Sequence, residues 1–209
     1  MPTDAFSQHD SPARAPAFAF TTHPSVAKFA TPMKQDLDAN PQFDAIIVGA
    51  HVYDRAGRLL LLQRAAHDSM PLRWEVPGGA CDLEDETILH GVARELWEES
   101  GLTPRRMSRL IKCRAQDGMV FVSRRQRIIC KYSFEVDVEQ GHDVKLDPDE
   151  HQAFVWATED ECRARKVGEL EIPFTTKEQE ELIQEGFKLR NEGLERGDRP
   201  ENDATSSGL

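Results

Sequence analysis

The chain has 209 residues, and 26 Lys and Arg against 37 Asp and Glu give it a formal net charge of −11 at pH 7. This balance excludes a general nucleic-acid binder, which needs positive charge to displace counterions from phosphates. It admits an anionic small substrate if a metal cation lies between substrate and protein. No stretch approaches the roughly 18 apolar residues of a membrane helix, and neither a secretory leader nor a Cys-x-x-Cys pair is evident. We therefore expect a cytoplasmic protein with reduced thiols and no membrane partner.

The two ends of the chain differ in composition from its middle. Residues 1–42 are rich in Ala, Pro, Ser and Thr, and their scattered phenylalanines follow neither a helical nor a strand period. The last residues are rich in Gly, Ser, Asp and Glu. We predict a disordered N-terminal arm at 1–42, one folded domain at 43–192 and a flexible C-terminal tail at 193–209.

The middle of the chain alternates between strand and helix patterns. Apolar, β-rich runs predict strands at 45–53, 58–64, 72–76, 107–116, 127–138 and 154–156. Periodic apolar residues and cap signals predict helices at 86–100, from Thr158 onward, and at 177–190. Gly101 follows the first helix, where a left-handed residue commonly ends a helix. This order of elements indicates an α/β protein.

The predicted helix at 86–100 gathers three carboxylates. At about 100° per residue, Glu98 and Glu99 lie one turn beyond Glu95, and all three flank the apolar stripe instead of opposing it. Like charges at this spacing repel, and partial burial strengthens the repulsion. The helix contains no Lys and one Arg, Arg94. The cluster therefore favours a hard divalent cation, Mg²⁺ or Mn²⁺; the alternative is a solvated acidic face.

The spacing of the whole segment resembles the Nudix box. That pattern is Gly, five residues, Glu, seven residues, Arg-Glu-apolar-x-Glu-Glu-x-Gly-apolar. Here Glu86 is followed after seven residues by Arg94-Glu95-Leu96, then by Glu98-Glu99 and Gly101-Leu102. Trp74-Glu75-Val76-Pro77-Gly78-Gly79 is similar to the strand and turn that lead into the box. The resemblance implies a Nudix-type α/β/α sandwich with a mixed β-sheet, and a box that forms a loop, a helix and a loop.

One position departs from the family pattern. Six residues separate Gly79 from Glu86, where the pattern has five. We interpret the extra residue as an insertion in the loop, because loops absorb single insertions and the spacing from Glu86 to Arg94 is intact. The alternative, Asp85 as the family Glu, would break the helical register to Arg94. The resemblance then implies that Glu86 and Arg94 form an ion pair anchoring the loop to the helix.

The resemblance also implies roles for the acidic residues. Glu98 and Glu99 would be the principal metal ligands, and Glu95 a further ligand or the base that orients water. The backbone carbonyl of Gly79 would be another metal ligand. Glu150 resembles an extra carboxylate that many relatives place opposite the box, as a ligand or general base; the alternative is an exposed acid in a turn.

Three residues outside the box have two interpretations each. Arg64 ends a predicted strand and either contacts a substrate phosphate or lies on the surface. Trp74 either stacks on a base or packs in the core. His151 is interpreted as a loop residue.

The resemblance implies metal-dependent hydrolysis of a phosphoanhydride bond in a nucleoside diphosphate linked to another moiety. The partner would be a small nucleotide or another diphosphate. Dinucleotide and ADP-ribose relatives tend to have a proline about 15 residues after the box, and this chain has none there. Oxidised or ordinary nucleoside triphosphates and dinucleoside polyphosphates remain open as substrates, and we favour a nucleotide-pool substrate. The alternatives are a Nudix-fold module that binds nucleotides without cleaving them, and a prenyl-diphosphate isomerase.

Overall fold

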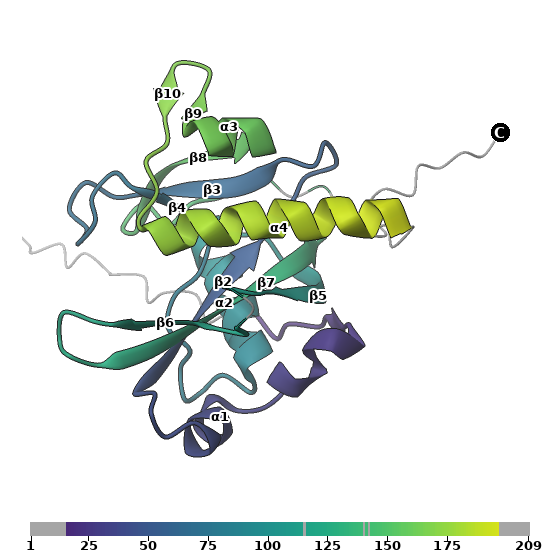
Figure 1. Ribbon diagram of the computed structural model, residues 1–209, viewed down its shortest axis with the longest axis vertical. Helices are drawn as coiled ribbons and strands as arrows, with labels where there is room; N and C mark the ends of the chain where they lie inside the picture. Colours follow the sequence, from purple (N-terminus) through teal and green to yellow (C-terminus); the bar gives the residue numbers. More distant parts are fainter. Residues whose placement is uncertain (1–15, 115, 140, 142, 197–209) are drawn as a thin grey trace, which may run out of the picture.

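The computed structural model describes residues 16–114, 116–139, 141 and 143–196. It contains two main sheets with a long helix between them (Figure 1). The larger sheet has the spatial order β1 (Thr21–Thr22), β5 (Pro104–Ile111), β7 (Ile128–Val138) and β2 (Ala45–His51), and β6 (Met119–Val122) also pairs with β7. The smaller sheet has the order β4 (Trp74–Glu75), β3 (Leu59–Arg64) and β8 (His151–Ala157), and β9 (Lys166–Val167) forms a separate hairpin with β10 (Leu170–Glu171).

The helices cover the sheets on different sides. They are the 3₁₀ helix η1 (Pro24–Phe29) and the α-helices α1 (Met33–Ala39), α2 (Ile88–Ser100), α3 (Glu159–Ala164) and α4 (Lys177–Arg196). β2 runs parallel to β7, whereas β5 and β6 run antiparallel to it. The mixed sheet and the α/β architecture predicted from the sequence are therefore confirmed.

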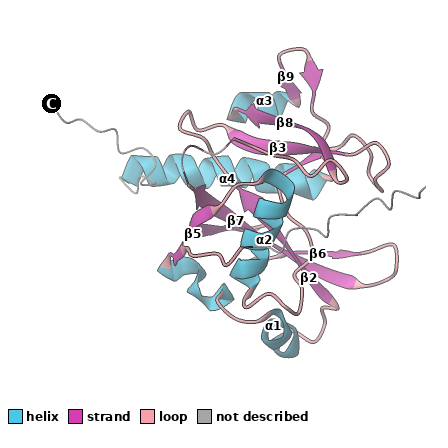
Figure 2. Cartoon of the chain, turned by 180° about the vertical axis from the view of Figure 1, so that it is seen from behind, coloured by secondary structure: helices cyan, strands magenta, loops and turns pink. Residues whose placement is uncertain are grey.

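Alternation along β2 assigns its two faces to two helices. Ile46, Val48 and Ala50 are buried in one cluster with the apolar stripe of α2, including Val92 and Leu96. Figure 2 shows α2 in front of this face. Because successive strand residues point to opposite faces, the intervening positions of β2 face α4.

Helix α4 fills the space between the two sheets. Its Ile183 and Phe187 are buried with Leu59 and Leu61 of β3 and with Trp74 of β4. This second cluster holds the smaller sheet against the helix. The arrangement leaves a cavity near the first turn of α4, where the two sheets meet α2.

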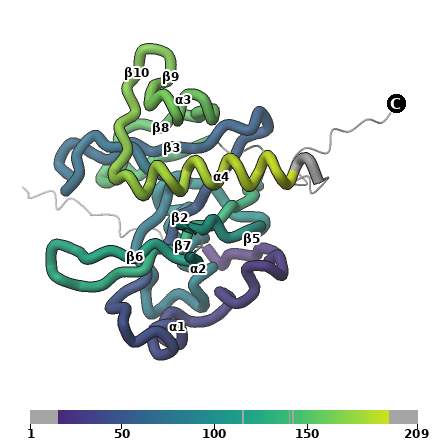
Figure 3. Tube along the Cα trace, in the orientation of Figure 1, coloured from purple at the N-terminus to yellow at the C-terminus, as the bar shows by residue number. Residues whose placement is uncertain are grey.

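The N-terminal strap, residues 16–42, corrects the prediction of a disordered arm over 1–42. Val26 and Phe29 of η1 are buried at 0% and 3% exposure, and the carbonyl of Thr31 accepts the N–H of Ile88 at 2.9 Å. Figure 3 shows this purple part of the trace beside β5 and α2. Its elements are too short for a periodic pattern, so their burial depends on partners far along the chain. Residues 1–15 lie outside the described part.

The last helix is longer than the pattern predicts. Helix α4 runs to Arg196, past the expected start of the tail at 193, and the Arg190–Glu135 ion pair at 3.0 Å ties its second half to β7. The rest of the predicted tail, 197–209, lies outside the described part. Among the described residues, no helix combines the length and the apolar character that crossing a membrane requires.

Helix ends follow the predicted cap chemistry. Gly101 ends α2 with a φ of 68°, the left-handed conformation that glycine adopts readily. Thr158 begins α3 with a capping box, in which its side chain and that of Glu161 each bond the other's backbone N–H. Helix α2 starts later than predicted, because Thr87 is its N-cap and accepts the N–H of His90.

Candidate active site

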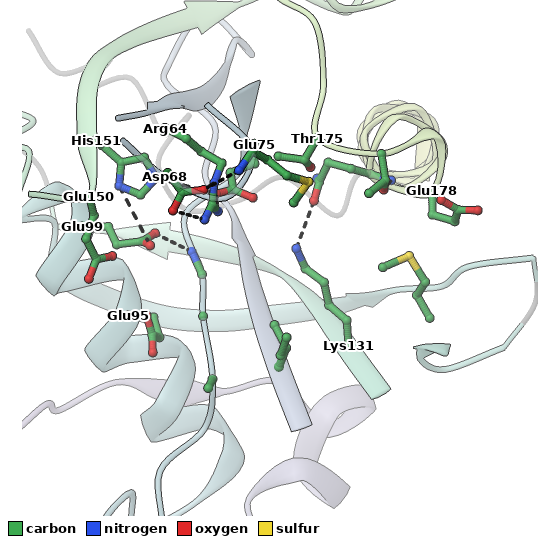
Figure 4. Close-up of a pocket in the computed structure, with 18 of the residues that line it drawn as sticks. Arg64, Asp68, Glu75, Glu95, Glu99, Lys131, Glu150, His151, Thr175 and Glu178 are labelled. Carbon is green, nitrogen blue, oxygen red and sulfur yellow. Dashed lines mark hydrogen bonds and ion pairs between the residues drawn. The ribbon is translucent and has the colours of Figure 1, made fainter. Parts of the chain in front are cut away.

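A cavity of about 720 Å³ lies between α2, the two sheets and the start of α4. Its ionisable lining includes Arg64, Glu75, Glu95, Glu99, Lys131 and Glu150. Figure 4 shows Glu95, Glu99, Glu150 and His151 at one end, with Lys131 and Glu178 toward the other. The carboxylates predicted on α2 and in the loop before β8 thus meet in one place, except Glu98.

The two glycines before the box bring the backbone close to the carboxylates. Gly78 has a φ of 152°, and a Cβ there would lie 2.1 Å from the carbonyl oxygen of Val48. Its N–H donates to Oε2 of Glu99 at 2.6 Å. A Cβ on Gly79 would lie 2.4 Å from Oε2 of Glu95. Glycine at position 78 therefore lets this segment pack against the backbone of β2, and glycine at position 79 leaves room for the carboxylate of Glu95.

The two buried glutamates of α2 resist ionisation. Burial raises the pKa of Glu99 well above its usual value, and nearby carboxylates add to the effect, whereas the Gly78 N–H opposes it. Burial likewise raises the pKa of Glu95 to about 7, against the lowering influence of Arg94. A divalent cation would relieve this repulsion, so the donor set fits a metal of the predicted kind.

Glu75 and His151 complete the acidic end of the cavity. Nε2 of His151 lies 3.8 Å from Oε1 of Glu75, and its Nδ1 lies 4.0 Å from Oε1 of Glu99. One ligand atom each of Glu99, Glu150 and His151 lies within 4.8 Å of the other two. Burial opposes ionisation of Glu75, but the adjacent His151 and two cationic side chains outweigh it and lower the pKa of Glu75. The cavity therefore contains an additional carboxylate that stays ionised.

Arg94 has a different partner from the predicted one. Its Nε and Nη2 donate to the two carboxylate oxygens of Asp85 at 2.9 and 3.0 Å, and the side chain of Asp85 is only 6% exposed. Glu86 is 81% exposed, and its carboxylate lies 3.6 Å from the ring of His90. The predicted Glu86–Arg94 ion pair is therefore wrong.

The cause lies in the residues just before the helix. Because Thr87 is the N-cap, Glu86 precedes the first turn and points to solvent. Asp85 also accepts the N–H of Asp82 at 2.8 Å, which folds the loop back over the helix. Asp85 thus anchors the loop to α2, the role that the resemblance gave to Glu86.

Glu98 and Trp74 lie outside the cavity lining. The carboxylate of Glu98 is 42% exposed and accepts from Nη1 of Arg94 at 3.0 Å. Trp74 is fully buried in the core. Side chains alternate along β4, so Glu75 faces the cavity while Trp74 faces the opposite way. The interpretation of Trp74 as a base-stacking ring is therefore wrong.

Arg64 lines the cavity with its guanidinium already engaged. Its Nε and Nη2 donate to Asp68 at 2.8 and 2.6 Å, and its Nη1 donates to Glu75. The backbone carbonyl of Gly79, predicted as a ligand, accepts the N–H of Val48 at 2.8 Å. Both groups are in place at the cavity, but each already holds a neighbouring part of the protein.

The sequence analysis did not identify Glu75, Lys131 and the buried position of His151. Nζ of Lys131 donates to Oε1 of Gln179 at 3.0 Å, and burial lowers the pKa of Lys131. Lys131 pairs in register with Ile47 on one side and Met119 on the other. A lysine inside a strand that is otherwise buried was the available signal, since lysine is rarely buried without a partner.

Comparisons with known proteins agree with this geometry. A family model described as NUDIX domain matches residues 44–177. A MutT-like protein of Streptomyces ambofaciens is 42% identical over 71 residues, which cover 34% of this chain and 43% of that protein. A CTP pyrophosphohydrolase of Escherichia coli (strain K12) is 30% identical over 132 residues, 61% of this chain and 87% of that protein. The matched part of this chain spans less than half the length of the MutT-like protein.

Solved structures show the same fold. The crystal structure of the MutT protein from Methanosarcina mazei Go1 matches with a TM-score of 0.52 and 26% identity. The match covers 70% of this chain and 94% of that one. The family model begins after the N-terminal strap and ends at the start of α4.

Proposed function

The chain belongs to the Nudix family, and on that premise we propose that it is a metal-dependent pyrophosphohydrolase that cleaves a phosphoanhydride bond in a nucleoside diphosphate derivative. The observation that carries this proposal is the convergence of Glu95, Glu99 and Glu150 on one end of a single cavity. Each comes from the segment that the sequence analysis named for it.

In this proposal Glu99 and Glu150 hold the metal, with Glu95 next to them. A divalent ion supplies a Lewis acid that neutralises charge on the phosphates and lowers the pKa of the attacking water. Glu95 lies against Gly79 and receives a hydrogen bond from Arg94 at 2.8 Å. We assign Glu95 to orient the attacking water and accept its proton.

The remaining residues fix this arrangement. The N–H of Gly78 holds one oxygen of Glu99, and Asp85 holds Arg94 against the loop. Lys131 is the cavity cation with donors left for the substrate, because the guanidinium of Arg64 is engaged by two carboxylates. Lys131 would therefore balance substrate charge away from the metal.

We propose a nucleotide-pool substrate for this cavity. Its volume of about 720 Å³ lies within the range of roughly 300–1,000 Å³ that small-molecule sites occupy. The E. coli relative is named for CTP, which supports a nucleoside triphosphate as substrate. Ile47 and Met119 flank Lys131 and offer apolar contacts to a base.

A product assay tests the function. The protein is incubated with each common nucleoside triphosphate and Mg²⁺ or Mn²⁺, and products are separated by chromatography. We expect a nucleoside monophosphate and pyrophosphate from at least one substrate, and none when EDTA removes the metal. If no substrate is cleaved while a nucleotide raises the melting temperature, the protein is a binding module and the proposal is wrong.

A further inference from the structure

The imidazole of His151 is buried without a hydrogen-bond partner. Its side chain is 2% exposed at the start of β8, and neither ring nitrogen makes a hydrogen bond within the described part of the chain. Buried polar groups are nearly always satisfied, because leaving one unpaired costs free energy. The ring nitrogens of His151 therefore stay available to a ligand held between the imidazole and the neighbouring carboxylates.

The distances exclude an ordinary hydrogen bond and suit a shared ion. His151 Nδ1 lies 4.0 Å from Oε1 of Glu99, beyond hydrogen-bond range. One atom each of Glu99, Glu150 and His151 falls within 4.8 Å of the other two. Two ligand atoms that are each about 2.0–2.2 Å from one ion are at most roughly 4–4.4 Å apart, and three such atoms are closer still, so side-chain movements of about 1 Å would bring this set onto one ion.

The backbone fixes which oxygen of Glu99 faces the imidazole. Oε2 accepts the N–H of Gly78 at 2.6 Å, and Oε1 is the atom closest to His151. The carboxylate is therefore oriented toward the ring by a hydrogen bond on its other oxygen. Such outer contacts set the direction of metal ligands in proteins.

We propose that His151 is a direct nitrogen ligand of the divalent ion, together with Glu99 and Glu150, and that the site therefore prefers a transition-metal ion such as Mn²⁺ to Mg²⁺. The inference rests on the metal site of the proposed function. Mn²⁺ shares the oxygen ligands of Mg²⁺ but, as a transition metal, also accepts an imidazole nitrogen, whereas Mg²⁺ prefers oxygen ligands and keeps several waters. A nitrogen ligand in an otherwise carboxylate site changes its selectivity in that direction.

Pulsed electron paramagnetic resonance on the full-length protein with Mn²⁺ tests this directly. We expect a ¹⁴N coupling from a bound imidazole in the wild type and its loss in His151→Gln. The control is His90→Gln, because His90 packs on Phe20 outside the cavity. His90→Gln should keep the coupling.

Metal competition provides a second measurement. We expect His151→Gln to weaken Mn²⁺ binding by about tenfold or more, the size of effect seen when a metal's supporting groups are removed. Mg²⁺ binding should weaken much less, because its preferred ligands are retained. An equal loss for both ions would overturn the inference.

The outcomes separate this inference from the function it rests on. If Mn²⁺ binds the wild type without a ¹⁴N coupling, the inference is wrong while the hydrolase proposal stands. If the coupling is present but no nucleotide is cleaved, the ligand assignment stands and the hydrolase proposal fails. If neither ion binds, both are wrong. The wild-type spectrum decides the point even if His151→Gln does not fold.

Discussion

The two sides of helix α2 have opposite energetic characters. The side facing the cavity carries Glu95 and Glu99, whose pKa values are raised by burial and mutual repulsion. The side facing the N-terminal strap is apolar and aromatic: Phe20 packs on His90 at 4.9 Å, and Phe18 meets the edge of Trp97 at 6.4 Å between ring centroids.

The difference explains how a repulsive cluster persists in a stable fold. Buried carboxylates destabilise the metal-free protein, whereas buried apolar area stabilises it by roughly 25 cal/mol per Å². The strap and the sheet hold the helix from one side, so the carboxylates remain close together on the other. Functional residues commonly lower the stability of the folded protein, and the well-packed core around them offsets this loss.

The largest expected effect is on the cavity side, in Glu99→Gln. Removing this ligand should lower kcat by about a thousandfold or more, or roughly 4 kcal/mol in activation free energy. Stability should be unchanged or higher, because Gln keeps an oxygen for the Gly78 N–H and places no ionisable group in this buried position. Steady-state kinetics and thermal melts check both. Glu86→Gln is the matched control, since its carboxylate is 81% exposed and lies outside the cavity lining; an equal loss in the control would contradict the assignment.

On the strap side, Phe29→Ala should be the most destabilising change. Its ring is 3% exposed and lies 4.8 and 5.0 Å from the rings of Tyr132 and Phe134. Truncating a buried phenylalanine costs about 3–4 kcal/mol. Urea denaturation should show this loss, while kcat at low temperature stays within about twofold because no cavity residue changes. An unaltered midpoint would mean that the strap does not support the fold.

Asp85→Ala should be only slightly less harmful. It leaves Arg94, whose side chain is 16% exposed, without its main partner. Breaking a buried ion pair costs about 3 kcal/mol, and activity should fall as the loop carrying Gly79 loosens. Glu86→Ala should cost less than about 0.5 kcal/mol, as exposed positions do. A reversed order of the two variants would restore the pairing predicted from the sequence.

The smallest effect is a pH dependence of stability in the metal-free protein. Glu95 has a pKa raised from 4.5 to about 7, and that of Glu99 is raised further. Between the ordinary pKa of 4.5 and the raised pKa values of the folded state, the folded protein binds more protons than the unfolded chain. The free energy of unfolding therefore falls as the pH rises through this range. Asp68 and Glu75, with lowered pKa values, act below this window.

Thermal melts with EDTA at pH 5.5 and 7.5 measure this dependence. We expect the Tm to fall by roughly 2–4 °C across this range, the shift that about 1 kcal/mol gives for a chain of this size. Adding Mn²⁺ at pH 7.5 should restore it. A Tm that rises with pH would show that the cluster does not repel.

The sequence predicted the parts of the fold that depend on local pattern. The strands β2, β3 and β7, the helix α2 and the caps at Gly101 and Thr158 follow periodicity and cap chemistry, and all are present. The strap has no such pattern, because its contacts are with distant strands: β1 pairs with β5, and the buried Phe29 packs on Tyr132 of β7.

The sequence predicted which residue types form the candidate site, but not which way their side chains point. Counting residues favoured Glu86, whereas the N-cap at Thr87 turns that side chain outward and leaves Asp85 inside. The interpretation of His151 as a loop residue failed for a similar reason. A register shift between Gln63 and Arg64 pairs Arg64 with His151, and no sequence pattern marks that irregularity.

The buried face of the strap has a practical consequence for anyone shortening this gene product. A protein cut to the family match, 44–177, would lose Val26 and Phe29 at one end and nearly all of α4 at the other. Both hydrophobic cores would then be exposed to water, and large exposed apolar surfaces promote aggregation. Expression trials should begin no later than residue 16 and run through residue 196.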